Sequence, residues 1–109
     1  MDIYGLQTPA LVVERTLLQA NLDTMTRALP RDRLRPHIKA HKTTELARAQ
    51  AVNGHHNFTC ATIREMEGMA RAGLGTDLLL ANEVLDARRL GVLAAAGARE
   101  PRLTFTLDG

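Results

Sequence analysis

Hydrophobic positions along the chain follow two spacings, one typical of helices and one typical of buried strands. Apolar residues three and four apart from Leu17 to Leu29 predict a helix over residues 15–29, which Pro30 ends. Similar spacing and threonine caps predict further helices over residues 43–53, 62–73 and 83–96. Short apolar runs predict strands over residues 10–14, 34–40, 57–61, 77–81 and 103–107.

The order of these predicted elements is that of parallel β/α units. Strands recur about 20 to 25 residues apart with a helix between them, as in α/β proteins with a parallel sheet or barrel. A closed (β/α)8 barrel of the TIM type takes roughly 200 residues or more, whereas 109 residues supply about three and a half units. We therefore predict an α/β fold in which residues 1–109 form the N-terminal, incomplete part of a truncated barrel domain.

The charge distribution argues against a nucleic-acid partner. Fourteen Lys and Arg residues against 12 Asp and Glu residues give a net charge of +2, spread along the chain without a long basic run. Arg31, Arg33 and Arg35 lie close together, but no aromatic residues alternate with them to stack on bases. This arginine cluster is compatible with the binding of a small anionic ligand.

The cysteine content and the N-terminus bear on the compartment. Cys60 is the single cysteine, which excludes an intrachain disulfide and is compatible with a reducing compartment. The first residues lack a basic region followed by an apolar run, and no stretch approaches the roughly 20 apolar residues of a membrane span. We therefore expect a soluble, cytoplasmic protein with no membrane partner.

The stretch R-P-H-I-K-A-H-K-T, residues 35–43, gathers two lysines and two histidines at the end of a predicted strand. On a strand, the side chains of His37, Lys39 and His41 share one face and that of Ile38 takes the other. Lys39 then points into the barrel near the carboxyl end of its strand, where sites form in this architecture. Burying an unpartnered ammonium costs several kcal/mol, so an inward lysine indicates chemistry. On periodicity alone, a solvated lysine at a strand end is the competing interpretation.

Schiff-base formation is the chemistry that suits an inward Lys39. Neighbouring cations such as Arg35, His37 and His41 favour the uncharged form of the amine, and an uncharged amine attacks an aldehyde. The aldehyde would belong to a cofactor, because no side chain of a protein supplies one.

Four motifs carry a family resemblance. They are T-P-A-L-V-V-E near the N-terminus, R-P-H-I-K-A-H-K-T, E-M-E-G-M-A-R-A-G and D-L-L-L-A-N-E-V, and the resemblance that they carry covers nearly all 109 residues in the right order. In these motifs the chain resembles the N-terminal region of D-threonine aldolases and eukaryotic-type D-serine dehydratases. Those enzymes belong with alanine racemase to the barrel-type (fold type III) pyridoxal-phosphate superfamily, and the R-P-H-x-K-x-H-K block is specific to the aldolase and dehydratase branch.

The resemblance implies a pyridoxal 5'-phosphate-dependent lyase that acts on D-amino acids. By this resemblance Lys39 is the catalytic, internal aldimine lysine and Lys42 is not. The aldolase reaction cleaves a D-3-hydroxy amino acid to glycine and an aldehyde, whereas the dehydratase reaction gives pyruvate and ammonia. The resemblance also implies a divalent metal in full-length relatives, whose ligands near their C-terminus match nothing in residues 1–109.

Two alternatives to the lyase stay open. One is an amino-acid racemase of the same superfamily. The other is a non-catalytic truncated fragment that pairs with another copy or with a missing C-terminal region, because an open half barrel exposes sheet edges and apolar surface. We expect no catalysis by the 109 residues alone, since the groups that position and polarise a substrate carry much of the rate.

Asn82 completes the set of candidate cofactor-binding residues. It follows the predicted strand 77–81 at its carboxyl end, so we place it with His37 and Lys39 at the cofactor. His37 and His41 would lie far apart on a strand, which favours a structural role over a metal site.

Several other residues are expected in turns or in the core. We predict that His55 and His56 form an exposed turn, that Cys60 packs as a small hydrophobe, and that T-I-R-E from Thr62 is a capping box. The methionines expected on core faces of helices are Met25, Met66 and Met69.

Overall fold

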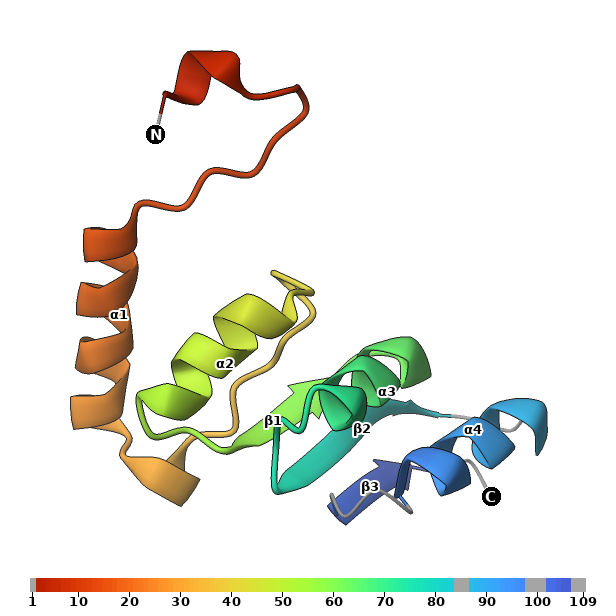
Figure 1. Ribbon diagram of the computed structural model, residues 1–109. Coiled ribbons are helices and arrows are strands. Elements are labelled where there is room, and N and C mark those ends of the chain that lie inside the picture. The colour runs from red at the N-terminus through yellow and green to blue at the C-terminus, as the bar shows by residue number, and fades with distance from the viewer. Residues whose placement is uncertain (1, 84–86, 98–101, 107–109) are drawn as a thin grey trace.

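Parallel strands and helices alternate along the chain, as the hydrophobic pattern predicts (Figure 1). The computed structural model describes residues 2–83, 87–97 and 102–106. Its helices are α1 (Arg15–Ala28), α2 (Thr44–Val52), α3 (Ile63–Arg71) and α4 (Ala87–Gly97), with short 3-10 helices at Ile3–Gly5 and Arg31–Arg33. Its strands are β1 (Asn57–Cys60), β2 (Asp77–Glu83) and β3 (Arg102–Thr106), which form a parallel sheet in the order β1-β2-β3. The α/β prediction is confirmed.

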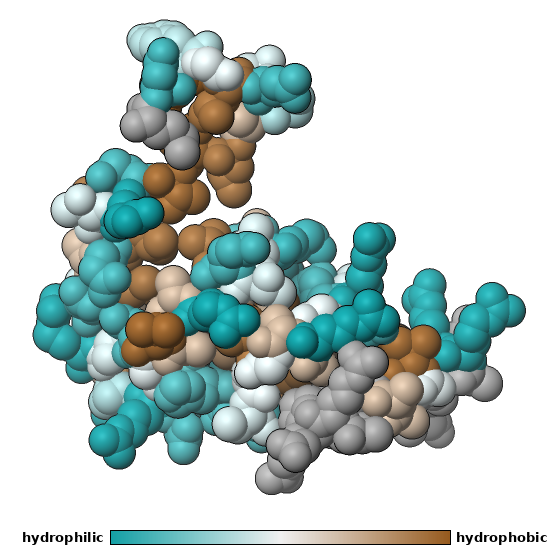
Figure 2. Space-filling model, viewed as in Figure 1, coloured by the Kyte–Doolittle hydropathy of each residue, from teal (hydrophilic) through white to brown (hydrophobic). Residues whose placement is uncertain are grey.

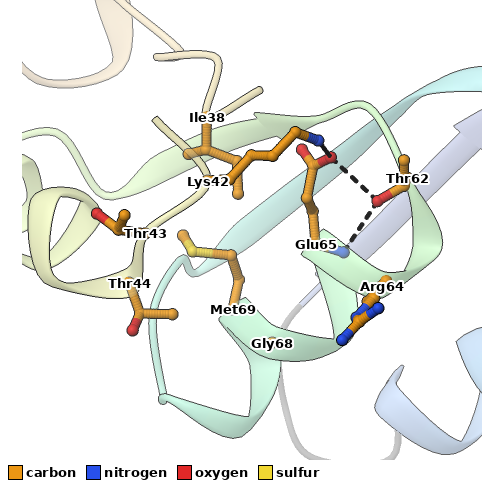
Figure 3. Close-up of a pocket in the computed structure, with 9 residues that line it drawn as sticks. All are labelled: Ile38, Lys42, Thr43, Thr44, Thr62, Arg64, Glu65, Gly68 and Met69. Atoms are coloured by element: carbon orange, nitrogen blue, oxygen red, sulfur yellow. Dashed lines mark hydrogen bonds and ion pairs between the residues drawn. The ribbon is translucent and has the colours of Figure 1, made fainter. Parts of the chain in front are cut away.

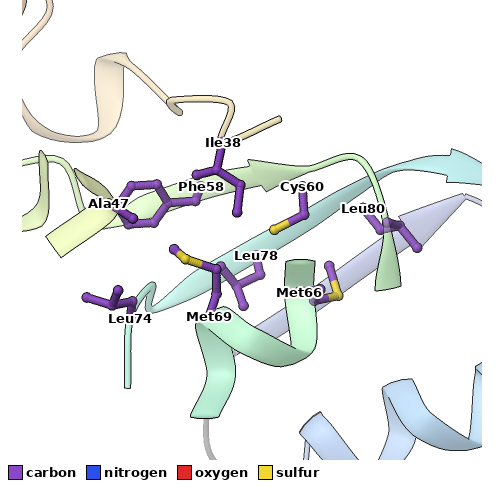
Figure 4. Packing of buried hydrophobic residues seen from close by; sticks show 9 residues of the cluster. All are labelled: Ile38, Ala47, Phe58, Cys60, Met66, Met69, Leu74, Leu78 and Leu80. Carbon is purple, nitrogen blue, oxygen red and sulfur yellow. The ribbon is translucent and has the colours of Figure 1, made fainter. Parts of the chain in front are cut away.

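The hydrophobic core lies between the sheet and α3. Alternate residues of each strand point to the same face, and on β1 and β2 the residues on this face are fully buried. Figure 4 shows these side chains gathered against the methionines of α3. The core cluster consists of Ile38, Ala47, Phe58, Cys60, Met66, Met69, Leu74, Leu78 and Leu80. Thr59 and Leu79, which pair in the sheet, belong to the opposite face.

The segment predicted as a strand over residues 34–40 is much shorter than expected. A single parallel bridge joins His37 to Thr59, with hydrogen bonds from Thr59 N–H to Pro36 O (2.8 Å) and from Ile38 N–H to Thr59 O (3.0 Å). Pro36 has no N–H to donate, and the chain turns directly after Ile38, so the ladder does not extend. The bridge nevertheless places this segment beside β1, before the three strands of the sheet.

The N-terminal region departs most from prediction. Residues 10–14 form no strand, because no other strand among the described residues lies beside them, and Leu11, Val12 and Val13 are exposed. Their apolar surface is visible in Figure 2 beside the start of α1. Met25 of α1 is also exposed, contrary to prediction, whereas Met66 and Met69 lie in the core as predicted.

The other observed helix and strand boundaries lie within a few residues of the predicted ones, and the start of α4 differs most. Because β2 continues to Glu83, the helix predicted from residue 83 begins only at Ala87 as α4. Residues 84–86 and 107, which belong to the predicted helix and the last predicted strand, lie outside the described residues. None of the helices in the described part of the chain is long and apolar enough to cross a membrane.

Candidate active site

A turn over residues 39–42 joins the bridge segment at His37 to α2 and carries the two lysines of the motif. Lys42 N–H donates to Ile38 O at 2.8 Å, and Lys42 adopts a φ of 53°, a left-handed conformation that non-glycine residues seldom take. Lys39 N–H donates to His37 Nδ1 at 3.2 Å. The imidazole of His37 therefore braces the backbone of Lys39 from inside the same motif.

Lys39 is exposed, and no side-chain partner binds its amine among the described residues. The described residues form an open sheet of three strands and one bridge, so the direction of Lys39 relative to a closed barrel stays a prediction. Ile38, the preceding residue, is buried in the core at 3% exposure. Ile38 is thus buried and Lys39 exposed, but Lys39 lies in a turn and not on the strand that was predicted to carry it.

Lys42 is also exposed, at 61% of its side chain, but its amine has a partner. Its Nζ lies 2.8 Å from Glu65 Oε2 in an ion pair, and the Glu65 side chain is only 8% exposed. Burial alone would raise the pKa of Glu65, but hydrogen bonds from Lys42, Ala61 N–H and the Thr62 hydroxyl, with the Lys42 charge, together hold that pKa below its ordinary value. The Lys42 amine is thus engaged in an ion pair with Glu65.

A cavity of about 480 Å³ lies between the start of α2 and α3, with the Lys42–Glu65 pair at its wall (Figure 3). Ile38 and Met69 of the core line it together with the caps Thr43 and Thr62. Lys39 does not line this cavity. Because the lysine in the cavity wall is already paired, the cavity does not present a free amine to an aldehyde.

His41 connects the same turn to α2. Its Nδ1 accepts a hydrogen bond from Thr43 N–H at 3.1 Å, so its Nε2 carries the proton in the neutral ring. Nε2 lies 3.2 Å from Gln50 Oε1 and donates to it. Both ring nitrogens of His41 are therefore occupied by structural contacts.

Two of the residues expected near Lys39 lie elsewhere or make other contacts. Arg35 is ion-paired with Asp77 at the amino end of the sheet, at the opposite end from Lys39. Asn82 lies within β2, not after it, and its exposed side chain donates to Ala61 O at 3.5 Å. Asn82 and Lys39 thus both belong to the carboxyl edge of the sheet.

The remaining candidates take structural positions. Cys60 is fully buried, and burial, reinforced by the charge of Glu65, raises the pKa of its thiol to about 12. The packing role predicted for Cys60 is confirmed. His56 is exposed as predicted, but His55 is buried, and its Nε2 donates to Leu29 O at 2.7 Å, joining the end of α1 to the start of β1.

No group of three His, Cys, Asp or Glu side chains that could hold a metal ion occurs within the described ranges. His37 and His41 each use Nδ1 to accept a backbone N–H. A structural role for both rings agrees with these contacts.

Residues 13–103 match the alanine racemase N-terminal domain family. The chain belongs to this family. The resemblance drawn from the sequence is therefore confirmed, and the parallel β/α units are those of the N-terminal part of the barrel of this family.

The chain is similar to several named proteins. A D-threonine aldolase from Arthrobacter sp. is 33% identical over 103 residues, which are 93% of this chain and 27% of the relative. A D-threo-3-hydroxyaspartate dehydratase from Delftia sp. (strain HT23) is 37% identical over 81 residues, 72% of this chain and 21% of the relative. The crystal structure of D-threonine aldolase from Filomicrobium marinum superposes with a TM-score of 0.86 at 32% identity, covering 98% of this chain and 29% of that one. The chain thus spans between a fifth and a third of the length of these relatives.

Glu65, whose carboxylate binds Lys42 in the wall of the cavity, was not identified from the sequence. The capping box T-I-R-E was visible in the sequence, and Thr62 Oγ1 accepts from Glu65 N–H at 3.1 Å as that motif predicts. The Glu65 carboxylate, however, accepts from Ala61 N–H at 3.1 Å and from Lys42 at 2.8 Å. A contact between residues 23 positions apart leaves no local signal.

Proposed function

We propose that the protein is a pyridoxal-phosphate-dependent lyase acting on D-amino acids, with Lys39 as the residue that holds the cofactor covalently. Its reaction would be that of D-threonine aldolase, cleaving a D-3-hydroxy amino acid to glycine and an aldehyde, or that of D-serine dehydratase. Family membership and the names of its relatives support the lyase class. The observation that carries the choice of lysine is the contrast between the exposed, unpaired Lys39 and the paired Lys42 among the described residues.

The described residues fit a cofactor that carries an aldehyde. When bound, pyridoxal phosphate supplies a carbonyl that condenses with amines and a ring that withdraws electrons from the α-carbon of an amino acid. The Lys39 amine lies at the carboxyl edge of the sheet, where the His37 ring fixes its backbone. Asn82 contributes an exposed amide at the same edge, suited to a polar group of cofactor or substrate.

Several finer points belong to the same proposal. A divalent metal at the substrate hydroxyl would take its ligands from outside residues 1–109. The buried, single Cys60 agrees with a reducing, cytoplasmic location. A homo-oligomer or a longer chain would supply the remaining walls of the site.

The test is an assay of the full-length protein with D-threonine and D-serine in the presence of pyridoxal phosphate. Glycine with an aldehyde indicates the aldolase, pyruvate with ammonia indicates the dehydratase, and interconversion of alanine enantiomers alone would indicate a racemase. Lys39→Arg keeps the charge but removes the nucleophile, so we expect it to abolish the reaction. Full activity in Lys39→Arg would contradict the assignment, whereas Lys42→Arg should retain most of the activity.

A further inference from the structure

The two lysines of the motif are three residues apart, yet the structure gives them different neighbours. Both side chains are exposed, but Lys39 has no side-chain partner in the described part of the chain, whereas Lys42 Nζ is 2.8 Å from Glu65 Oε2. Two exposed lysines in one turn would compete for one aldehyde, since each forms the same bond. A contact that engages one of the two amines would therefore favour reaction of the aldehyde with the other.

Glu65 has the geometry for such a contact. Its carboxylate accepts three hydrogen bonds, from Lys42 Nζ (2.8 Å), the Thr62 hydroxyl (3.0 Å) and Ala61 N–H (3.1 Å). The last two come from the start of α3 and fix the carboxylate where Lys42 reaches it. Because this side chain is 8% exposed and is held by two hydrogen bonds besides that of Lys42, it offers Lys42 a fixed partner.

We infer that Glu65 selects Lys39 over Lys42 as the site of cofactor attachment, by keeping Lys42 in an ion pair and by anchoring the turn that presents Lys39. The inference rests on the proposed function, because it concerns the same amine. Glu65 is a positioning residue here, since it acts through Lys42.

The geometry of the turn explains how the Lys42–Glu65 ion pair both engages the Lys42 amine and anchors the turn that presents Lys39. Lys42 adopts its φ of 53° while its N–H binds Ile38 O, so the ion pair holds a backbone conformation that non-glycine residues seldom adopt. His41 braces the other side of the turn through Gln50. The turn is thus attached to α2 through His41 and to α3 through Lys42, and Lys39 enters it from the buried Ile38.

The covalent step is balanced without any further reactant. The uncharged Lys39 nitrogen adds to the aldehyde carbon of pyridoxal phosphate, a carbon–nitrogen bond forms, and the carbonyl oxygen leaves as water with two protons. Borohydride, added as reductant, then delivers hydride to that carbon while nitrogen gains a proton from solvent. The resulting secondary amine survives digestion and marks the lysine that reacted.

The experiment compares label on Lys39 and Lys42 by peptide mass spectrometry after limited pyridoxal phosphate and borohydride treatment of the full-length protein. In the wild type we expect label on Lys39. In Glu65→Gln, which keeps the size of the side chain but loses its charge, we expect the share on Lys42 to rise about fivefold, which converts to about 1 kcal/mol. Glu67→Gln is the matched control, because it breaks the Glu67–Arg71 ion pair on the same helix and should leave the distribution unchanged.

The outcomes separate the inference from the proposed function. Label on Lys39 in the wild type with no gain on Lys42 in Glu65→Gln would overturn the inference and leave the proposed function standing. Label mainly on Lys42, or on neither lysine, in the wild type would overturn both.

If circular dichroism shows that Glu65→Gln does not fold, the variants Lys42→Arg and Lys42→Met test the inference instead. The arginine variant should label Lys39 at the wild-type rate, and the methionine variant several-fold more slowly. Equal rates would overturn the anchoring role.

Discussion

Arg35 Nη2 lies 3.1 Å from Asp77 Oδ2, an ion pair that joins the start of the first β/α unit to the first residue of β2. Arg35 Nη1 also donates to Phe58 O at 3.3 Å and to Asp77 O at 3.0 Å. One guanidinium therefore fastens the segment before Lys39 to β1 and β2 at the amino end of the sheet. A lysine at this position could not make the same contacts, because they depend on the several N–H donors that the planar guanidinium holds in a fixed arrangement.

Replacing Arg35 should destabilise the fold. Arg35→Gln leaves the Asp77 carboxylate without its cation, and Asp77 Oδ1 is already buried without a hydrogen-bond partner in the described residues. We expect the free energy of unfolding, measured by urea denaturation, to fall by about 1–3 kcal/mol. Arg71→Gln, which breaks an exposed pair with Glu67, should cost no more than about 0.5 kcal/mol. Equal losses of unfolding free energy in the two variants would show that the Arg35 contacts stabilise the fold no more than the Arg71–Glu67 pair does.

The lowered pKa of Glu65 predicts a pH-dependent contribution to stability. A carboxylate whose folded pKa is depressed stabilises the fold above its unfolded value of 4.5, and that contribution is lost as the pH falls through the folded pKa. The difference in unfolding free energy between wild type and Glu65→Gln should therefore be present at pH 7 and shrink below about pH 4.5. Urea denaturation at several pH values measures it, and a difference that grows toward acid pH would contradict the account.

Gly75 should tolerate no side chain. Its φ of 82° is unfavourable for other residues, and a Cβ there would collide with Leu78 in the core and lie 3.4 Å from Phe58 Cδ2. Gly73 has a similar φ of 68° but open space around it. We expect Gly73→Ala to cost about 1–2 kcal/mol from the backbone alone. Gly75→Ala should cost about 1–3 kcal/mol more from overpacking. Urea denaturation of the two variants compares them, and equal costs would contradict the packing at Leu78.

The buried thiol of Cys60 should be unreactive in the folded protein. Burial raises its pKa to about 12, so little thiolate is present at pH 8. We expect iodoacetamide to modify Cys60 only when urea unfolds the chain, as followed by intact mass. Rapid modification without urea would show that β1 is not packed as described.

Local patterns predicted the elements of the fold well, because they depend on residues near one another in sequence. The caps Thr43 and Thr62 and the apolar runs that form β1 and β2 were visible in the sequence. The apolar run over residues 10–14 was misassigned as a strand, since a strand requires a neighbour that the run itself does not specify. Periodicity in α1 likewise predicted a core face, yet none of its residues is buried.

The candidate site was predictable only in part. The R-P-H-I-K-A-H-K-T motif drew attention to Lys39 and His37, but its expected strand gives way to a turn after Ile38. The partners that distinguish the two lysines come from α3, and those that hold His41 come from α2. Such tertiary contacts depend on how helices pack against the sheet, which no spacing within the motif encodes.

Attachment of pyridoxal phosphate to Lys39 is tested most directly by the intact mass of the full-length protein after borohydride reduction. We predict a mass increase of one cofactor in the wild type and in Lys42→Arg, and no increase in Lys39→Arg at the same cofactor concentration. A full increase in Lys39→Arg would contradict the central claim.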